Sequence, residues 1–199
     1  MSLHISIVSI EGDAQASLEQ LFIDCDYKLN SPPVSVDTWD NLYKLLLEPE
    51  DKGTVYHKSR TTIIDPELVM MLDEEPMKKL SKQFGSVLTM VCEGVSATYG
   101  FAVYREGEKI RSLTVVDGSV ADEFGHPLPE EDGISASDLS EDTVLDILTK
   151  LGFDYTGLEQ ARGFNVYKLE FAEDVQSESD KSLNKLTVIP RKKPWWQFW

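Results

Sequence analysis

Residues 87–116 read VLTMVCEGVSATYGFAVYREGEKIRSLTVV, and this stretch decides the fold class. It holds three runs rich in β-branched and aromatic residues, at 87–92, 98–105 and 109–116, separated by two short breaks that contain glycine. Short runs with such separators are typical of consecutive antiparallel strands. The stretch therefore predicts a central three-stranded meander.

The middle strand of this meander has two unequal faces. Tyr99, Phe101 and Val103 alternate along one face. The other face carries the small side chains of Thr98, Gly100 and Ala102. Small residues in a strand indicate that another part of the molecule, such as a helix, or a ligand approaches closely. The sequence leaves these two alternatives open.

The rest of the chain alternates between helical and extended patterns. Helices are expected at 14–24, after an N-cap at Asp37, after Asp65-Pro66, at 73–84, and from the N-cap Ser140 to Gly152. Extended segments are expected at 3–10, 54–64 and 163–171, and a long loop at 117–139, which is rich in Gly and Pro. This order predicts the α+β class, with a mostly antiparallel sheet and helices packed on one face. We expect one domain over 1–172, and a flexible, disordered acidic tail over 173–199 that ends in an aromatic-basic motif.

Composition narrows the class of partner and the compartment. The 199 residues contain 19 Lys and Arg against 35 Asp and Glu, a formal charge of −16. This argues against nucleic acid as a partner, because phosphate binding depends on basic residues, and it favours a basic partner. Cys25 and Cys92 both lie in apolar runs and are expected to be buried thiols in a reducing cytosol. The first residues lack the basic region of a secretory signal, and no run approaches 18 apolar residues, so we expect a cytoplasmic protein.

The most acidic part of the chain is residues 117–146, which hold ten Asp and Glu and no Lys or Arg. Such a block can steer and bind a basic protein, can supply oxygen ligands to a hard cation, or can be a solvated loop next to an acidic helix start. It lacks the alternating oxygen positions of a calcium loop, so we expect no metal. The residues proposed to contact a protein partner are Asp122, Glu123, Glu130, Glu131, Asp132 and Asp138.

The segment 190–199 is basic, whereas the chain before it is acidic. It carries three basic residues and no acidic one, so that the rest of the chain has a charge of −19. Three of the four Trp fall in the last five positions. Such a segment can dock on its own domain or on a second copy, can be a binding motif for another protein, or can make weak contact with a membrane surface. Its candidate binding residues are Trp195, Trp196, Phe198 and Trp199.

Signals for catalysis are weak. Glu123 and His126 have the Glu-x-x-His spacing of some metal sites, but they lie in a Gly/Pro loop and not on a helix that would align them. The sequence has no nucleophile elbow, phosphate-binding Gly loop or His-Glu-x-x-His motif. We therefore expect no catalytic residue and no cofactor, and an enzyme is the weakest alternative.

Two segments, 99–111 and 124–131, together resemble a pattern found in small uncharacterised bacterial proteins. An aromatic-Gly-aromatic strand start leads through a Gly turn to Arg111, and a Gly-x-Pro-Leu-Pro-x-Glu loop follows. The resemblance spans residues 99–131 and implies no activity. The residues of this pattern allow Arg111 to pair with Glu130 or Glu131, which would fold the loop back over the sheet.

These features favour a non-enzymatic, cytoplasmic, protein-binding protein. Its most concrete form is an immunity or anti-toxin type of bacterial protein, whose acidic surface covers a basic partner. The alternative is an adaptor or peripheral membrane protein that acts through the Trp-rich segment. The sequence does not predict the oligomeric state.

Overall fold

The computed structural model describes residues 4–46 and 48–172, and the tail predicted at 173–199 lies outside this range. A nine-stranded sheet runs through the molecule in the order β3-β10-β4-β5-β1-β6-β7-β8-β9, and β11 pairs with β2 beside it. Every pairing between these strands is antiparallel. The strands are β1 His4–Glu11, β2 Tyr27–Leu29, β3 Val34–Val36, β4 Lys52–His57, β5 Arg60–Asp65, β6 Ser86–Glu93, β7 Thr98–Arg105, β8 Glu108–Val116, β9 Ser119–Phe124, β10 Phe164–Tyr167 and β11 Leu169–Phe171.

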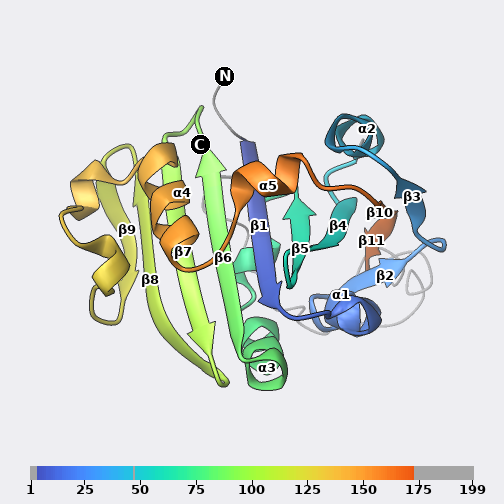
Figure 1. The fold of residues 1–199 in the computed structure, drawn as a ribbon, viewed down its shortest axis with the longest axis horizontal. Helices are drawn as coiled ribbons and strands as arrows, with labels where there is room; N and C mark the ends of the chain where they lie inside the picture. The colour runs from blue at the N-terminus through green and yellow to red at the C-terminus, as the bar shows by residue number, and fades with distance from the viewer. Residues whose placement is uncertain (1–3, 47, 173–199) are drawn as a thin grey trace, which may run out of the picture.

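Helices cover both faces of the sheet (Figure 1). The α-helices are α1 Leu18–Asp24, α2 Trp39–Leu45, α3 Glu74–Phe84, α4 Glu141–Lys150 and α5 Tyr155–Glu159, and the 3₁₀ turns are η1 Gln15–Ser17, η2 Met70–Leu72, η3 Pro129–Glu131 and η4 Ala136–Asp138. Strand β7 shows the division, because Phe101 and Val103 join the core under α4 and α5, whereas Ala102 and Tyr104 join the core under α1 and α3. The α+β class and the mostly antiparallel sheet are confirmed. The expectation that helices pack on one face was wrong, since the central strands bury apolar side chains in both directions.

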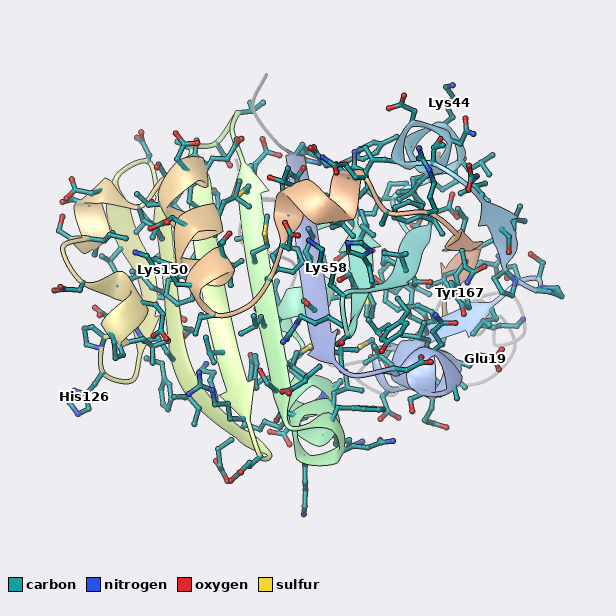
Figure 2. All side chains as sticks on the ribbon, in the orientation of Figure 1. Glu19, Lys44, Lys58, His126, Lys150 and Tyr167 are labelled. Carbon is teal, nitrogen blue, oxygen red and sulfur yellow. The ribbon has the colours of Figure 1, made fainter. Side chains whose placement is uncertain are left out.

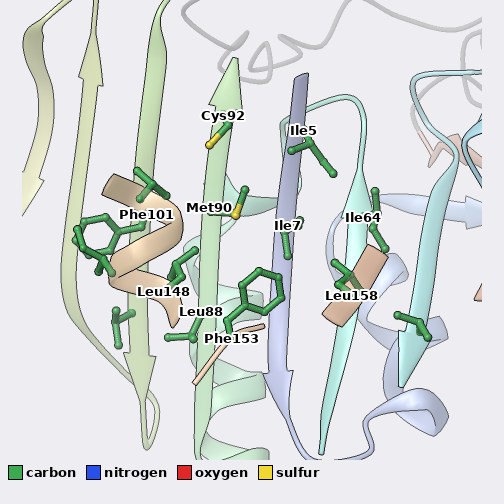
Figure 3. Packing of buried hydrophobic residues seen from close by; sticks show 14 of the residues in the cluster. Ile5, Ile7, Ile64, Leu88, Met90, Cys92, Phe101, Leu148, Phe153 and Leu158 are labelled. Atoms are coloured by element: carbon green, nitrogen blue, oxygen red, sulfur yellow. The ribbon is translucent and has the colours of Figure 1, made fainter. Parts of the chain in front are cut away.

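The core under α4 and α5 is the larger of the two (Figure 3). Leu148 of α4 and Phe153 beyond it pack with Leu88 and Met90 of β6 and with Phe101 of β7. Ser140 caps α4 as predicted, since its hydroxyl accepts the N–H of Thr143. This core fixes the positions of β6, β7 and β8, which carry much of the site described below.

The central meander has the three predicted strands, with β6 paired to β7 and β7 to β8. It continues into a fourth strand, β9, where a loop was expected over 117–139. That expectation was wrong because β9 is an edge strand with every residue exposed, so it lacks the apolar alternation that identifies a half-buried strand. The 3₁₀ turns η3 and η4 follow it.

On the other half of the sheet, one local prediction was incomplete and another was wrong. The extended segment at 54–64 is a hairpin of β4 and β5, turned at Lys58 and Ser59, which both adopt positive φ. Asp65 ends β5 and does not begin a helix. Its buried carboxylate accepts the N–H groups of Val69 and Met70 at 2.9 Å and so organises the turn after the strand.

Candidate functional site

A groove with a cavity volume of about 950 Å³ lies on the face of β6–β9 opposite α4. Its floor includes Thr98 and Ala102 of β7 and Ser112 and Thr114 of β8. Helix α3 covers the same face only as far as Glu74 at its N-terminal end, which lines the groove. Thr98 and Ala102 of the small face of β7 thus line a groove, and Ala102 also packs in the core under α1 and α3, so both a concavity and a helix border this face.

Gly100 lies in this floor strand for a different reason. A Cβ at this position would lie 2.6 Å from the Thr114 hydroxyl oxygen and 3.0 Å from the Leu113 carbonyl oxygen. Glycine thus allows the side chain of Thr114 to lie against β7. The small residues keep the floor flat and let β8 pack closely.

The walls of the groove are largely apolar. Leu68 and Leu72 contribute one side, from the segment that joins β5 to α3, and Val91 and Val95 contribute another. Leu72 is 48% exposed and Val95 is 96% exposed. Exposed apolar side chains that gather around a concavity are typical of a binding site.

The charged groups of the groove are mainly acidic. Glu74, Glu93 and Asp122 line it together with Lys109, whose Nζ lies 2.9 Å from a Glu74 carboxylate oxygen. His4 pairs with Glu93. Asp122 accepts a 2.8 Å hydrogen bond from the hydroxyl of a floor residue and has no cationic partner among the described residues.

The pKa of Tyr104 is raised in part by the negative charges around this site. Its ring lines the groove next to α3. Burial raises the pKa of the Tyr104 hydroxyl, and the charges of Glu74 and Asp122 raise it further. The same field that disfavours a phenolate would favour a cation in the groove.

On the other face of the sheet, Arg111 organises the loop after β9. Its guanidinium is 1% exposed and donates to both carboxylate oxygens of Glu131, with Nε–Oε1 at 3.0 Å and Nη2–Oε2 at 2.9 Å. Its Nη1 donates to Glu123 at 3.0 Å and to the carbonyl oxygens of Phe124 and Gly125. The predicted pairing of Arg111 is thus present, with Glu131 as the partner.

This cluster changes the interpretation of the acidic block. Glu131 is buried and Glu123 is paired, so neither is a free surface charge. The Asp138 carboxylate accepts a hydrogen bond from Ser135 at 2.6 Å. Asp132 is exposed, and Asp122 faces the groove. Of the six acidic candidates, the structure therefore brings only Asp122 into the groove; Trp195, Trp196, Phe198 and Trp199 lie outside the described residues.

The Glu-x-x-His pair does not form a site in the described part of the chain. Glu123 points to Arg111, while His126 is exposed and extends away from the loop (Figure 2). No group of three or more His, Cys, Asp or Glu within residues 4–46 and 48–172 is placed to hold a metal ion.

A second buried charge cluster lies at the far side of the sheet. Lys52 is fully buried, and its Nζ lies 2.9 Å from Asp65, 3.4 Å from Glu67 and 3.0 Å from the Pro49 carbonyl oxygen. Burial raises the pKa of Glu67, and the charge of Lys52 opposes this effect. An ammonium group has three donors, and all three are used. We read this cluster as structural.

Sequence reasoning missed most of the groove. Its lining residues come from separate parts of the chain: the connection between β5 and α3 (Leu68 and Leu72), the start of α3 (Glu74), the turn after β6 (Val95) and β8 (Lys109). The one usable signal was the run of small residues on alternate positions of β7.

The chain matches no protein-family model, no curated protein and no solved structure with which it was compared. None of the helices in the described ranges has the length and apolar character needed to cross a bilayer.

Proposed function

We propose that this protein is a non-catalytic binding protein that takes a basic and apolar segment of another protein into the β6–β9 groove. The observation that carries the proposal is the groove itself, in which apolar walls surround carboxylates and one of these, Asp122, has no cationic partner among the described residues. An apolar concavity with a few placed polar groups is the general form of a binding site. The cytoplasm remains the proposed compartment.

The charge of the groove supports a cationic ligand. Glu74 and Lys109 neutralise each other at 2.9 Å, and this leaves Glu93, beside His4, and Asp122 as acceptors. A Lys or Arg side chain can place its stem on the apolar walls and its charge at Asp122. An anionic ligand, such as nucleic acid, would meet repulsion there.

The overall charge supports a protein partner. A formal charge of −16 accelerates the encounter with a basic protein through long-range attraction. An immunity or anti-toxin type of protein, which covers a basic bacterial toxin, has this combination of charge and an interaction surface. The exposed carboxylate of Asp132 would then contribute steering from outside the groove.

Partner capture with matched variants tests this proposal. Full-length wild-type protein, Val95→Arg and Asp122→Asn would be used to capture proteins from lysate of the native host at low and high salt. Val95→Arg places a positive charge at the groove rim, and Asp122→Asn removes the free charge but keeps an acceptor for the floor hydroxyl. The controls are Ile23→Arg on α1, an exposed apolar position outside the groove, and Asp132→Asn.

We expect a basic protein that salt releases, that both controls retain and that both groove variants lose. Equal capture by all five proteins would overturn the groove as the binding site. Loss with Asp132→Asn but not with Asp122→Asn would place the interface on the loop side of the sheet instead.

A further inference from the structure

We propose that the segment 190–199 of this same chain docks into the β6–β9 groove and that an external partner must displace it. The inference rests on the proposed function, because it names a resident competitor for the same site. It assigns the Trp-rich segment an autoinhibitory role.

The chemistry of the segment matches that of the groove. Residues 191–193 supply three cations, and positions 195, 196, 198 and 199 supply four large aromatic side chains, with no acidic residue among them. The groove offers the complement, with apolar walls at Leu68, Leu72 and Val95 and an acceptor at Asp122. Burial of Trp and Phe on such walls removes apolar surface of both partners from water.

The connection is long enough to reach. The description of the chain ends at 172, just after β11, and 18 residues separate this point from Arg191. An extended chain of that length spans at most roughly 60 Å. A domain of about 170 residues has a radius of gyration of about 15 Å and so a diameter of roughly 40 Å, which the extended connection exceeds.

Because the segment and the groove belong to the same chain, a modest affinity between them is sufficient for docking. Binding within one chain through a short connection corresponds to an effective concentration of about 1 mM. A segment that binds the groove with a Kd of about 10 μM would then occupy it almost completely, and a competing peptide would bind roughly 100-fold more weakly than to an empty groove. The charge of −19 on the rest of the chain adds attraction for the basic end of the segment.

The test uses a fluorescent peptide of sequence 190–199 and the full chain. In the tail-silent variant, Trp195, Trp196, Phe198 and Trp199 are all replaced by Ala, so that the groove lacks its resident segment while the described part of the chain is unchanged. Anisotropy titrations would compare the peptide affinity of this variant with that of wild-type protein. Val95→Arg and Asp122→Asn in the tail-silent background locate the site, and Ile23→Arg is the matched control.

We expect the peptide to bind the tail-silent variant and to bind wild-type protein about 100-fold more weakly, with tail-silent binding lost in the groove variants and kept in the control. No peptide binding to the tail-silent variant would overturn this inference and leave the partner-capture result untouched. Equal binding to wild-type and tail-silent protein would show that the segment is not resident. Peptide binding that survives both groove substitutions would place it elsewhere.

A second measurement distinguishes docking of the segment within one chain from its docking on a second copy or on a membrane surface. In a Trp39→Phe background, Trp fluorescence reports on the three Trp of the segment alone. We expect these Trp to be protected from acrylamide and exposed by Val95→Arg, at protein concentrations where light scattering gives a monomer. Protection that appears only in a dimer, or only after addition of phosphatidylglycerol vesicles, would contradict docking within one chain.

Discussion

The buried pair of Arg111 and Glu131 gives the sharpest stability prediction. Glu131→Gln keeps the shape of the side chain but removes the charge that faces two guanidinium nitrogens at 2.9–3.2 Å. Removal of one member of a buried pair leaves the other charge uncompensated, which costs about 3–5 kcal/mol. Because Glu123 still accepts from Arg111 at 3.0 Å, we expect the lower end, roughly 3 kcal/mol.

Thermal and urea unfolding of full-length protein would measure this loss. For a protein of this size, roughly 3 kcal/mol corresponds to a fall in Tm of about 6–12 °C. Glu130→Gln is the matched control, since it makes the same chemical change one residue earlier, where no described guanidinium contacts the side chain, and it should stay within about 0.5 kcal/mol of wild type. Amide exchange in the loop 125–138 should accelerate in Glu131→Gln only.

A double-mutant cycle tests the reasoning itself. Arg111→Met should lower the free energy of unfolding about as much as Glu131→Gln, because it leaves the buried carboxylate of Glu131 without a cation. Arg111→Met with Glu131→Leu should cost clearly less than the sum of Arg111→Met and Glu131→Leu alone, since two matched apolar groups replace the pair. If each single variant loses less than about 1 kcal/mol, the pair is solvated in solution and the argument from desolvation is refuted.

Three further predictions concern pH, thiol reactivity and backbone geometry. Hydrogen bonds from Lys78 and Lys109 hold the pKa of Glu74 below its usual value. The contribution of Glu74 to the free energy of unfolding is therefore present above the ordinary carboxyl pKa and is lost as pH falls through the lower folded pKa. Glu74→Gln should reduce the loss of stability in acid by less than about 1 kcal/mol. Burial, and then a nearby carboxylate, raise the pKa of Cys92 to about 12, so iodoacetamide at pH 8 should label this thiol only after urea unfolding, and labelling of the native chain would contradict its burial. Gly125→Ala should destabilise by at least about 2 kcal/mol in a urea melt, because a Cβ at this positive φ would overlap a carbonyl oxygen of β8, whereas Gly133→Ala has a similar φ and open space and should cost about 1 kcal/mol.

The sequence alone predicted those elements whose residues carry their own signal. The strands of the meander are identified by β-branched and aromatic runs between Gly breaks, and α4 by the Ser140 cap and an apolar stripe. The burial of both Cys was also predicted, because each lies in an apolar run, and both are buried. In each case the evidence lies within about ten residues.

Only the tertiary structure could decide the features that depend on contacts across the chain. Edge strand β9 has no buried face, so its own sequence does not distinguish it from a loop, and pairing with β8 defines it. The choice of Glu131 over Glu130 as the partner of Arg111 depends on how η3 turns toward the sheet. The groove lies beside the N-terminal end of α3 at Glu74, and no local pattern records where a helix will lie on a sheet. The proposal of a basic partner thus rests on charge and composition, whereas the packing of distant elements forms the groove in which we propose that this partner binds.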